Sequence, residues 1–288
     1  MEIVKNKYNF YEVKKKPSHS ELKEYYVKKY YQQNLAAYSK KYTEEELQYI
    51  RNKIAQKYFL IKDKINEEES VKLLDVGCGE GHTLKFFKEK GWEVEGLDYS
   101  EFGIKTHNPE CLDHFSSGDI YENLKKIVNE GHEYDVIWLD NVLEHVLNPL
   151  ELLRISNTLS ASGGVLIVEV PNDFSRLQSM LQNKELIEKD YWIALPDHLS
   201  YFNLEGLKNI SREANWDLYD CISDYPIEFN LVNPNANYVN DKTKGRGAHL
   251  QRVRMVNFMH IVFLSLRPSR FSGRWLKWVS ADRLLQYL

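Results

Sequence analysis

The fold is decided by residues 71–81, which read VKLLDVGCGEG. A short run of β-branched and apolar residues, typical of a buried strand, leads into glycines at alternate positions, Gly77, Gly79 and Gly81. Glycines so placed let the backbone turn tightly against a ligand and let the next helix begin close to that ligand. The stretch therefore predicts a strand, a glycine turn and a helix over 81–90.

Beyond this turn, strand-like runs alternate with helical stretches. The expected strands are WEVEGLD (92–98), a weak one near Phe115, YDVIWLD (134–140) and GGVLIVEV (163–170). The expected helices begin at Glu101 or cover 121–130, 149–160 and 204–214. Strict alternation predicts βαβ units, and so a doubly wound, mostly parallel α/β sheet with helices on both faces.

Two later runs predict the edge of the sheet. WDLYDCIS (216–223) and MHIVFLSL (259–266) both have strand character, and we expect a non-helical loop to join them. Two strands joined without a helix predict an antiparallel edge. The main domain then covers 69–266, with insertions 173–200 and 224–256 on the acceptor side.

The two ends of the chain are expected to be helical. Residues 1–68 show helical spacing of apolar positions from 18 to 64 and no strand signal, which predicts an N-terminal helical cap with two helices. Residues 267–288 contain Arg274, Trp275, Lys277 and Trp278, a pattern that favours an amphipathic helical tail.

Composition excludes several classes of protein. The net charge of −4 over 288 residues argues against general nucleic-acid binding. Three scattered cysteines show no metal-ligand spacing and imply no disulfide framework, which suits a reducing cytoplasm. The longest apolar run in the tail, 258–266, is too short to span a bilayer. We therefore expect a cytoplasmic protein without metal and without stable membrane insertion, in which the tail packs on its own domain or on a second subunit of a homodimer.

Acidic residues follow the strands at the edge where a parallel sheet binds ligands. Asp98 lies about twenty residues after the glycine turn, where a carboxylate can accept two hydrogen bonds from a ribose diol. A dinucleotide fingerprint would need glycine at position 82, which is His82, so the spacing disfavours NAD. An NAD-dependent oxidoreductase remains an alternative.

Four motifs in order, LLDVGCGEG, GLDYS, GDI and YDVIWLDNVLEHV, resemble the class I S-adenosylmethionine (SAM)-dependent methyltransferases over roughly residues 70–266. The resemblance implies a seven-stranded sheet with one antiparallel strand and SAM as the cofactor. It implies that the methionine part is surrounded by Asp75, Gly77, Cys78, Gly79 and Gly81. It implies that Asp98, with Tyr99 beside it, holds the ribose, that Asp119 and Ile120 hold the adenine, and that Asp140 and Asn141 lie beside the amino-acid end.

A narrower resemblance concerns the acceptor. LPDHLSYF (195–202) and PIEF (226–229) are similar to segments of methyltransferases encoded with bacterial surface-polysaccharide pathways. This implies O-methylation of a sugar or of a phosphorylated or nucleotide-linked small molecule. N-methylation of an amino sugar or another small molecule is an alternative, and a non-catalytic SAM-binding protein is a further one.

The expected acceptor side carries side chains suited to proton transfer and to anion binding. His198 and His145 are the candidate bases for a hydroxyl nucleophile, because histidine exchanges protons near neutral pH. Residues 241–288 hold ten Lys and Arg against two Asp. We expect five of these cations, in the loop between the last two strands, to bind an anionic acceptor: Lys242, Lys244, Arg246, Arg252 and Arg254.

Overall fold

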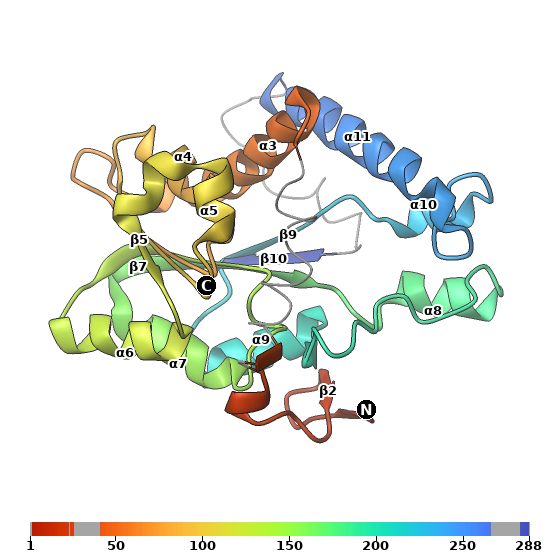
Figure 1. The fold of residues 1–288 in the computed structure, drawn as a ribbon, viewed down its shortest axis with the longest axis horizontal. Coiled ribbons are helices and arrows are strands. Elements are labelled where there is room, and N and C mark those ends of the chain that lie inside the picture. Colours follow the sequence, from red (N-terminus) through yellow and green to blue (C-terminus); the bar gives the residue numbers. More distant parts are fainter. Residues whose placement is uncertain (1, 23, 26–40, 266–282, 288) are drawn as a thin grey trace.

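A seven-stranded sheet forms the centre of the computed structural model, which describes residues 2–22, 24–25, 41–265 and 283–287 (Figure 1). The strand order is β5-β4-β3-β6-β7-β10-β9. The strands are β3 (Lys72–Val76), β4 (Glu93–Asp98), β5 (Phe115–Ser117), β6 (Tyr134–Asp140), β7 (Ser160–Pro171), β9 (Asp220–Ser223) and β10 (Arg283–Tyr287). β3 to β7 pair in parallel, whereas β10 runs antiparallel to both β7 and β9. The predicted fold class is confirmed, including the antiparallel strand.

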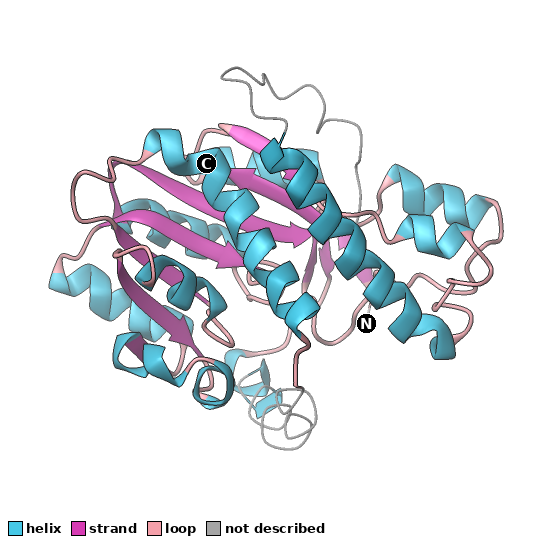
Figure 2. Ribbon diagram, turned by 90° about the horizontal axis from the view of Figure 1, so that it is seen from above, coloured by secondary structure: helices cyan, strands magenta, loops and turns pink. Residues whose placement is uncertain are grey.

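Helices cover both faces of this sheet (Figures 1 and 2). One face carries α3 (Glu44–Ile61), α4 (His82–Lys88), α5 (Phe102–His107) and α11 (Gly245–Ser265). The other carries α6 (Ile120–Glu130), α7 (Pro149–Leu159) and α9 (Leu204–Glu213). The period-two pattern of β6 explains the two layers: Ile137 and Leu139 pack with the second group of helices, Val136 and Trp138 with the first. Short 3-10 helices, η1 (Lys62–Lys64) and η2 (Pro109–His114), complete these connections.

The N-terminal segment contains strands, contrary to the expectation of helices alone. β1 (Ile3–Lys5) and β2 (Tyr11–Val13) form an antiparallel sheet with β8 (Ser200–Tyr201). These strands are three residues long or shorter, so too few positions alternate for the pattern to be read from sequence. The predicted helix that ends near residue 64 is confirmed as α3, whereas much of the first predicted helix lies outside the described residues.

The C-terminal assignments are wrong in two places. MHIVFLSL was expected to be the last strand, but residues 259–265 belong to α11, which packs against α3 with Val253, Val256 and His260 buried (Figure 2). An apolar run of this length fits a buried helix as well as a strand, and the pairing with α3 decides the matter. The last strand is β10, within the tail expected to be helical; residues 266–282 lie outside the described part.

The two insertions form a lobe beside the sheet. The first holds α8 (Arg176–Asn183), and the second, expected to be a loop, holds α10 (Glu228–Val232), η3 (Lys242–Lys244) and the start of α11. Leu181, Trp192 and Leu231 pack the two insertions together. Among the described helices, none is both long and apolar enough to cross a membrane.

Candidate functional site

The glycine turn after β3 has a backbone that needs glycine. Gly77, Gly79 and Gly81 have φ values of 77°, 53° and 77°. A Cβ at Gly77 would lie 2.5 Å from a methyl carbon of Val142, and one at Gly81 would lie 2.9 Å from Ile104. The amides of Gly77 and Cys78 donate to the Leu97 carbonyl at 2.7 and 3.0 Å, which fixes the turn against β4. The turn therefore brings backbone close to anything bound above the strand ends.

Asp98, at the end of β4, is held beside this turn. One carboxylate oxygen accepts from the Gly79 amide at 2.9 Å and the other from the Ser100 amide at 3.1 Å. Burial raises the pKa of Asp98, and these backbone hydrogen bonds act in the opposite direction. Each oxygen keeps a lone pair for a further donor, as a ribose diol would require.

The residues expected at the adenine end follow β5. Asp119 caps α6 by accepting from the Glu122 amide at 3.0 Å, and its other oxygen lies 2.9 Å from His19 Nε2. Ile120 is the first residue of α6. Much of the Asp119 carboxylate is thus already engaged within the protein.

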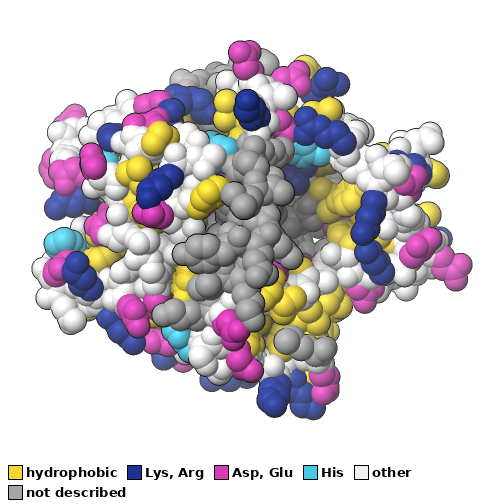
Figure 3. Space-filling view, viewed as in Figure 1, with side chains coloured by type: hydrophobic (Ala, Val, Ile, Leu, Met, Phe, Trp, Pro, Cys, Tyr) yellow, Lys and Arg dark blue, Asp and Glu magenta, His cyan; other side chains and the backbone are white. Residues whose placement is uncertain are grey.

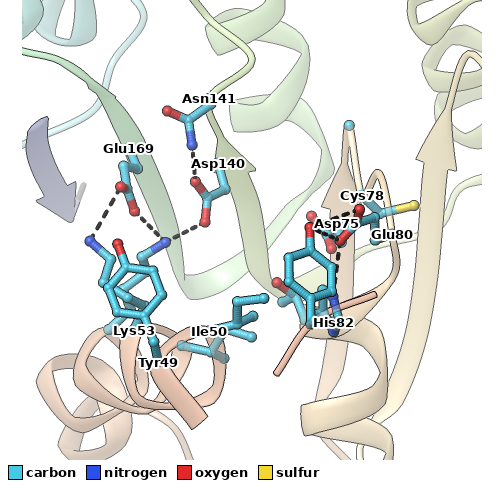
Figure 4. Close-up of a pocket in the computed structure, with 15 residues that line it drawn as sticks. Tyr49, Ile50, Lys53, Asp75, Cys78, Glu80, His82, Asp140, Asn141 and Glu169 are labelled. Atoms are coloured by element: carbon cyan, nitrogen blue, oxygen red, sulfur yellow. Dashed lines mark hydrogen bonds and ion pairs between the residues drawn. The ribbon is translucent and has the colours of Figure 1, made fainter. Parts of the chain in front are cut away.

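A cavity of ≈ 390 Å³ opens between the strand ends and α3 (Figure 4). Five of the residues expected at the methionine end of the cofactor line it, namely Asp75, Gly77, Cys78, Asp140 and Asn141, whereas Gly79 and Gly81 do not. The ribose and adenine candidates Asp98, Tyr99, Asp119 and Ile120 do not line it. The remaining lining residues come from α3, the segment before it, the turn, α4 and β7: Tyr42, Tyr49, Ile50, Lys53, Ile54, Lys57, Glu80, His82, Thr83 and Glu169.

Buried charges form one wall of this cavity (Figure 4). The Lys57 ammonium contacts the carboxylates of Asp140 and Glu169. Burial alone would lower the pKa of Lys57, but the two carboxylates outweigh it and raise the pKa above its ordinary value. Lys53, one helical turn away, lies 3.4 Å from Glu169 and 2.8 Å from Asp224. Sequence reasoning missed this set because lysines four apart on an amphipathic helix are normally solvated.

Asp75 lies at the floor of the same cavity, and its pKa is raised well above the ordinary value, first by burial and then by the nearby Asp140. At the rim, Glu80 accepts from Tyr42 at 3.0 Å and lies 3.1 Å from His82 and 3.4 Å from His107. Burial would raise the pKa of Glu80, but these partners lower it. Of the charged side chains that line the cavity, four are acidic and two are lysines, so the acidic groups outnumber the lysines, which suits a cationic ligand.

His145 and His198, the candidate bases, are neighbours. Their ring centroids lie 4.8 Å apart, and the Nδ1 of His145 lies 2.9 Å from the Asp197 carbonyl oxygen. The buried Glu144 places a carboxylate oxygen 3.8 Å from the Nε2 of His145. Because Nδ1 donates to that carbonyl, the neutral His145 carries its lone pair on Nε2. The structure brings both histidines together, and neither lines the cavity described above.

The five cations expected in a loop do not lie in one. Lys242 and Lys244 belong to η3, and the three arginines belong to α11. Arg246 contacts Glu46 at 2.8 Å, Arg252 contacts Asp224 at 3.2 Å, and Arg254 lies 3.5 Å from Glu45. These arginines connect α11 to α3 and to the segment after β9. The sequence could not reveal these acidic partners, because they come close only when residues 245–265 form a helix beside α3.

On the face shown in Figure 3, the described charged side chains do not gather into a patch of a single charge sign. Among the described side chains, Lys and Arg are interspersed there with Asp and Glu. Of the five cations expected to bind an acceptor, Lys244 and the three arginines each have an acidic partner within the described part of the chain.

The chain is similar to known methyltransferases. The family model described as "Methyltransferase domain" matches residues 26–220. A ubiquinone biosynthesis O-methyltransferase of Caulobacter sp. (strain K31) is 34% identical over 106 residues, 36% of this chain and 42% of that protein. The mitochondrial one of Arabidopsis thaliana is 25% identical over 178 residues, 60% of this chain and 55% of that protein. The chain thus spans about half the length of these curated relatives.

A solved structure has the same fold over nearly the whole chain. It is the plantazolicin methyltransferase BamL in complex with a triazolic desmethylPZN analog and SAH. The TM-score is 0.52 at 13% identity, and the match covers 93% of this chain and 97% of that one.

Proposed function

The chain belongs to the methyltransferase domain family, and from this premise we propose that it transfers the methyl group of SAM to a hydroxyl group of a small-molecule acceptor. The observation that carries the proposal is the glycine turn, whose left-handed backbone places Gly79, with open space at its Cβ position, beside Asp98 and next to the cavity that Asp75 lines. A side chain at Gly77 would clash with Val142 and so displace the turn. Acidic side chains outnumber lysines in the cavity lining, which suits a sulfonium cation.

The sulfonium supplies an activated methyl group, so the protein mainly has to hold the acceptor oxygen in line with it. Such positioning can contribute about 7–11 kcal/mol to lowering the barrier. We propose His198, with His145 beside it, as the base that takes the proton from the acceptor hydroxyl. The Asp197 carbonyl holds the ring of His145 in the tautomer that can accept a proton at Nε2.

Oxygen as the accepting atom is supported by the curated relatives, which are named as O-methyltransferases. Those relatives act in ubiquinone biosynthesis by name, which favours a phenolic hydroxyl. The sugar hydroxyl of a surface-polysaccharide precursor is the second candidate, and it depends on LPDHLSYF (195–202) and PIEF (226–229) alone. N-methylation would need an amine acceptor, which no described contact favours over a hydroxyl.

The test has two arms. Isothermal calorimetry with SAM, S-adenosylhomocysteine (SAH) and NAD should show binding of the first two and none of NAD. A labelled-methyl assay then compares catechol-type phenols, nucleotide sugars and an amino sugar, with a boiled protein as the control. Binding of NAD, or failure to bind SAM and SAH, would overturn the proposed activity, while the acceptor panel decides between phenol, sugar and amine.

A further inference from the structure

The wall of the cavity is an electrically balanced set of six ionised groups. Three cations contact three carboxylates: Lys57 with Asp140 and Glu169, Lys53 with Glu169 and Asp224, and Arg252 with Asp224. The Arg252 guanidinium also donates to the Tyr49 hydroxyl at 2.6 Å, and Tyr49 lines the cavity. We name this set the ionic wall.

Of the four members of the ionic wall that line the cavity, Asp140 is the most exposed. The side chain of Asp140 is 29% exposed, whereas those of Lys57 and Glu169 are 1% and 0% exposed. Asp140 is also fixed in place, because its other oxygen accepts from the Asn141 amide and Asn141 N donates to the Glu169 carbonyl at 2.9 Å. A ligand therefore meets the wall first at Asp140 (Figure 4), whose carboxylate contacts the Lys57 ammonium.

Burial limits what such a wall can accept. A single added cation or anion would leave one buried charge without a counter-charge, which is costly in a site shielded from water. A group that carries one ammonium and one carboxylate adds no net charge and can exchange partners with the pairs already present. The α-amino acid end of SAM and SAH is such a group.

We propose that Lys57, Asp140 and Glu169 form the subsite for this amino-acid end, an inference that depends on the function proposed above. The ligand ammonium takes the place of the Lys57 ammonium at Asp140. The Lys57 ammonium stays on Glu169 and turns its remaining N–H donors to the ligand carboxylate. Helix α3 is thus part of the cofactor site, and Lys57 is the residue that binds the carboxylate of the ligand.

The experiment compares two ligands that differ only in that carboxylate: SAH and its decarboxylated analogue, S-adenosyl-3-thiopropylamine. Calorimetry on the full chain should show that the native protein binds SAH at least about tenfold more tightly, the value of one hydrogen bond between charged groups. In Lys57→Met the ratio of the two dissociation constants should fall to about one or reverse, because the vacant place at Asp140 then favours a ligand with an ammonium alone.

A matched control lies on the same helix. Arg51 pairs with Glu89 outside the cavity, at 2.8 Å, so Arg51→Met should leave the ratio of the native protein unchanged. If Lys57→Met does not fold, Lys57→Gln with Glu169→Gln, which removes both charges together, gives the same readout. A tenfold ratio that survives the loss of the Lys57 charge overturns the subsite, as does a native protein that does not distinguish the two ligands. A native protein that binds neither ligand overturns the proposed function instead.

Discussion

At the scale of single residues, the carboxyl of Asp75 predicts an unusual pH dependence of stability. Its pKa is raised well above the ordinary value by burial and by Asp140, with Lys57 acting in the opposite direction. Above about pH 4 the unfolded chain loses this proton while the folded protein keeps it. The free energy of unfolding should therefore fall as pH rises, by at most about 1.4 kcal/mol per pH unit, until the folded carboxyl ionises.

Asp75→Asn removes the titrating carboxyl and, with it, this pH dependence of the free energy of unfolding. The difference in free energy of unfolding between the variant and the native protein should grow in favour of the variant from pH 4 towards neutral pH. Urea unfolding at a series of pH values, without ligand, measures it. A difference that stays constant across this range would mean that Asp75 titrates normally in the folded protein.

Asp98 tests the cofactor site at its other end. Asp98→Ala should weaken SAM binding by about 1.5–3 kcal/mol, since it removes an ionised acceptor of hydrogen bonds. Glu101→Ala is the control, because Glu101 lies three residues further on and pairs with the exposed Lys105. Calorimetry on variants whose unfolding transition is intact gives the comparison, and an unchanged affinity for SAM would remove Asp98 from the site.

The two histidines test the acceptor side. His198→Ala should lower turnover by about two decades or more while the affinity for SAM stays nearly the same, because a base acts on the acceptor. His145→Ala should affect both quantities, and the exposed His132→Ala neither. Near-normal turnover in His198→Ala with an inactive His145→Ala would exchange the two roles.

At the scale of elements, the contact between α3 and α11 has a role that the sequence had assigned elsewhere. Arg246 and His249 both contact the buried Glu46, which also closes the capping box at the start of α3. Burial would raise the pKa of Glu46, but hydrogen bonds from the Thr43 amide, Arg246 and His249 lower it strongly. Arg246 thus makes a contact between the two helices.

Arg246→Ala should lower the free energy of unfolding by about 1 kcal/mol, a hydrogen bond to a charged group discounted because the guanidinium is more than half exposed. The Michaelis constant for the acceptor should not change. Arg254→Ala is the matched control, because its pair with Glu45 is exposed on both sides and contributes little. An increased acceptor Michaelis constant in Arg246→Ala with unchanged stability would restore the clamp hypothesis.

At the scale of the whole molecule, the sequence predicted the parts of the fold whose signal is local. The central strands β3, β6 and β7 are buried over most of their length, so their apolar runs and the glycine turn at Gly77 could be recognised directly. The antiparallel strand was expected but assigned to the wrong residues, because RLLQY (283–287) and MHIVFLSL (259–266) differ in what they pack against, not in local pattern. The same reason hid Lys57, whose function depends entirely on partners far along the chain.

The small N-terminal sheet shows how distant segments complete this molecule, and Phe10 is the residue that joins it to the main core. Phe10 is buried, and its ring centroid lies 4.5 Å from that of Phe202. A Cβ added at Gly206 of α9 would lie 2.6 Å from the Cβ of Phe10, so the helix already lies against this residue. Phe10→Ala should therefore lower the free energy of unfolding by about 3–5 kcal/mol, since α9 cannot move in to fill the space.

The matched control for Phe10 is Phe229, a phenylalanine that is 54% exposed, and Phe229→Ala should change stability by no more than about 0.5 kcal/mol. Denaturant unfolding measures both variants, and calorimetry with SAH on the folded fraction shows whether the cofactor site is affected. We expect the SAH affinity to stay unchanged, because Phe10 packs on the face of the sheet that carries α6, α7 and α9, opposite α3 and the ionic wall. A loss of SAH affinity in a folded Phe10→Ala protein would mean that the N-terminal sheet, and not α3 alone, sets the shape of the cofactor site.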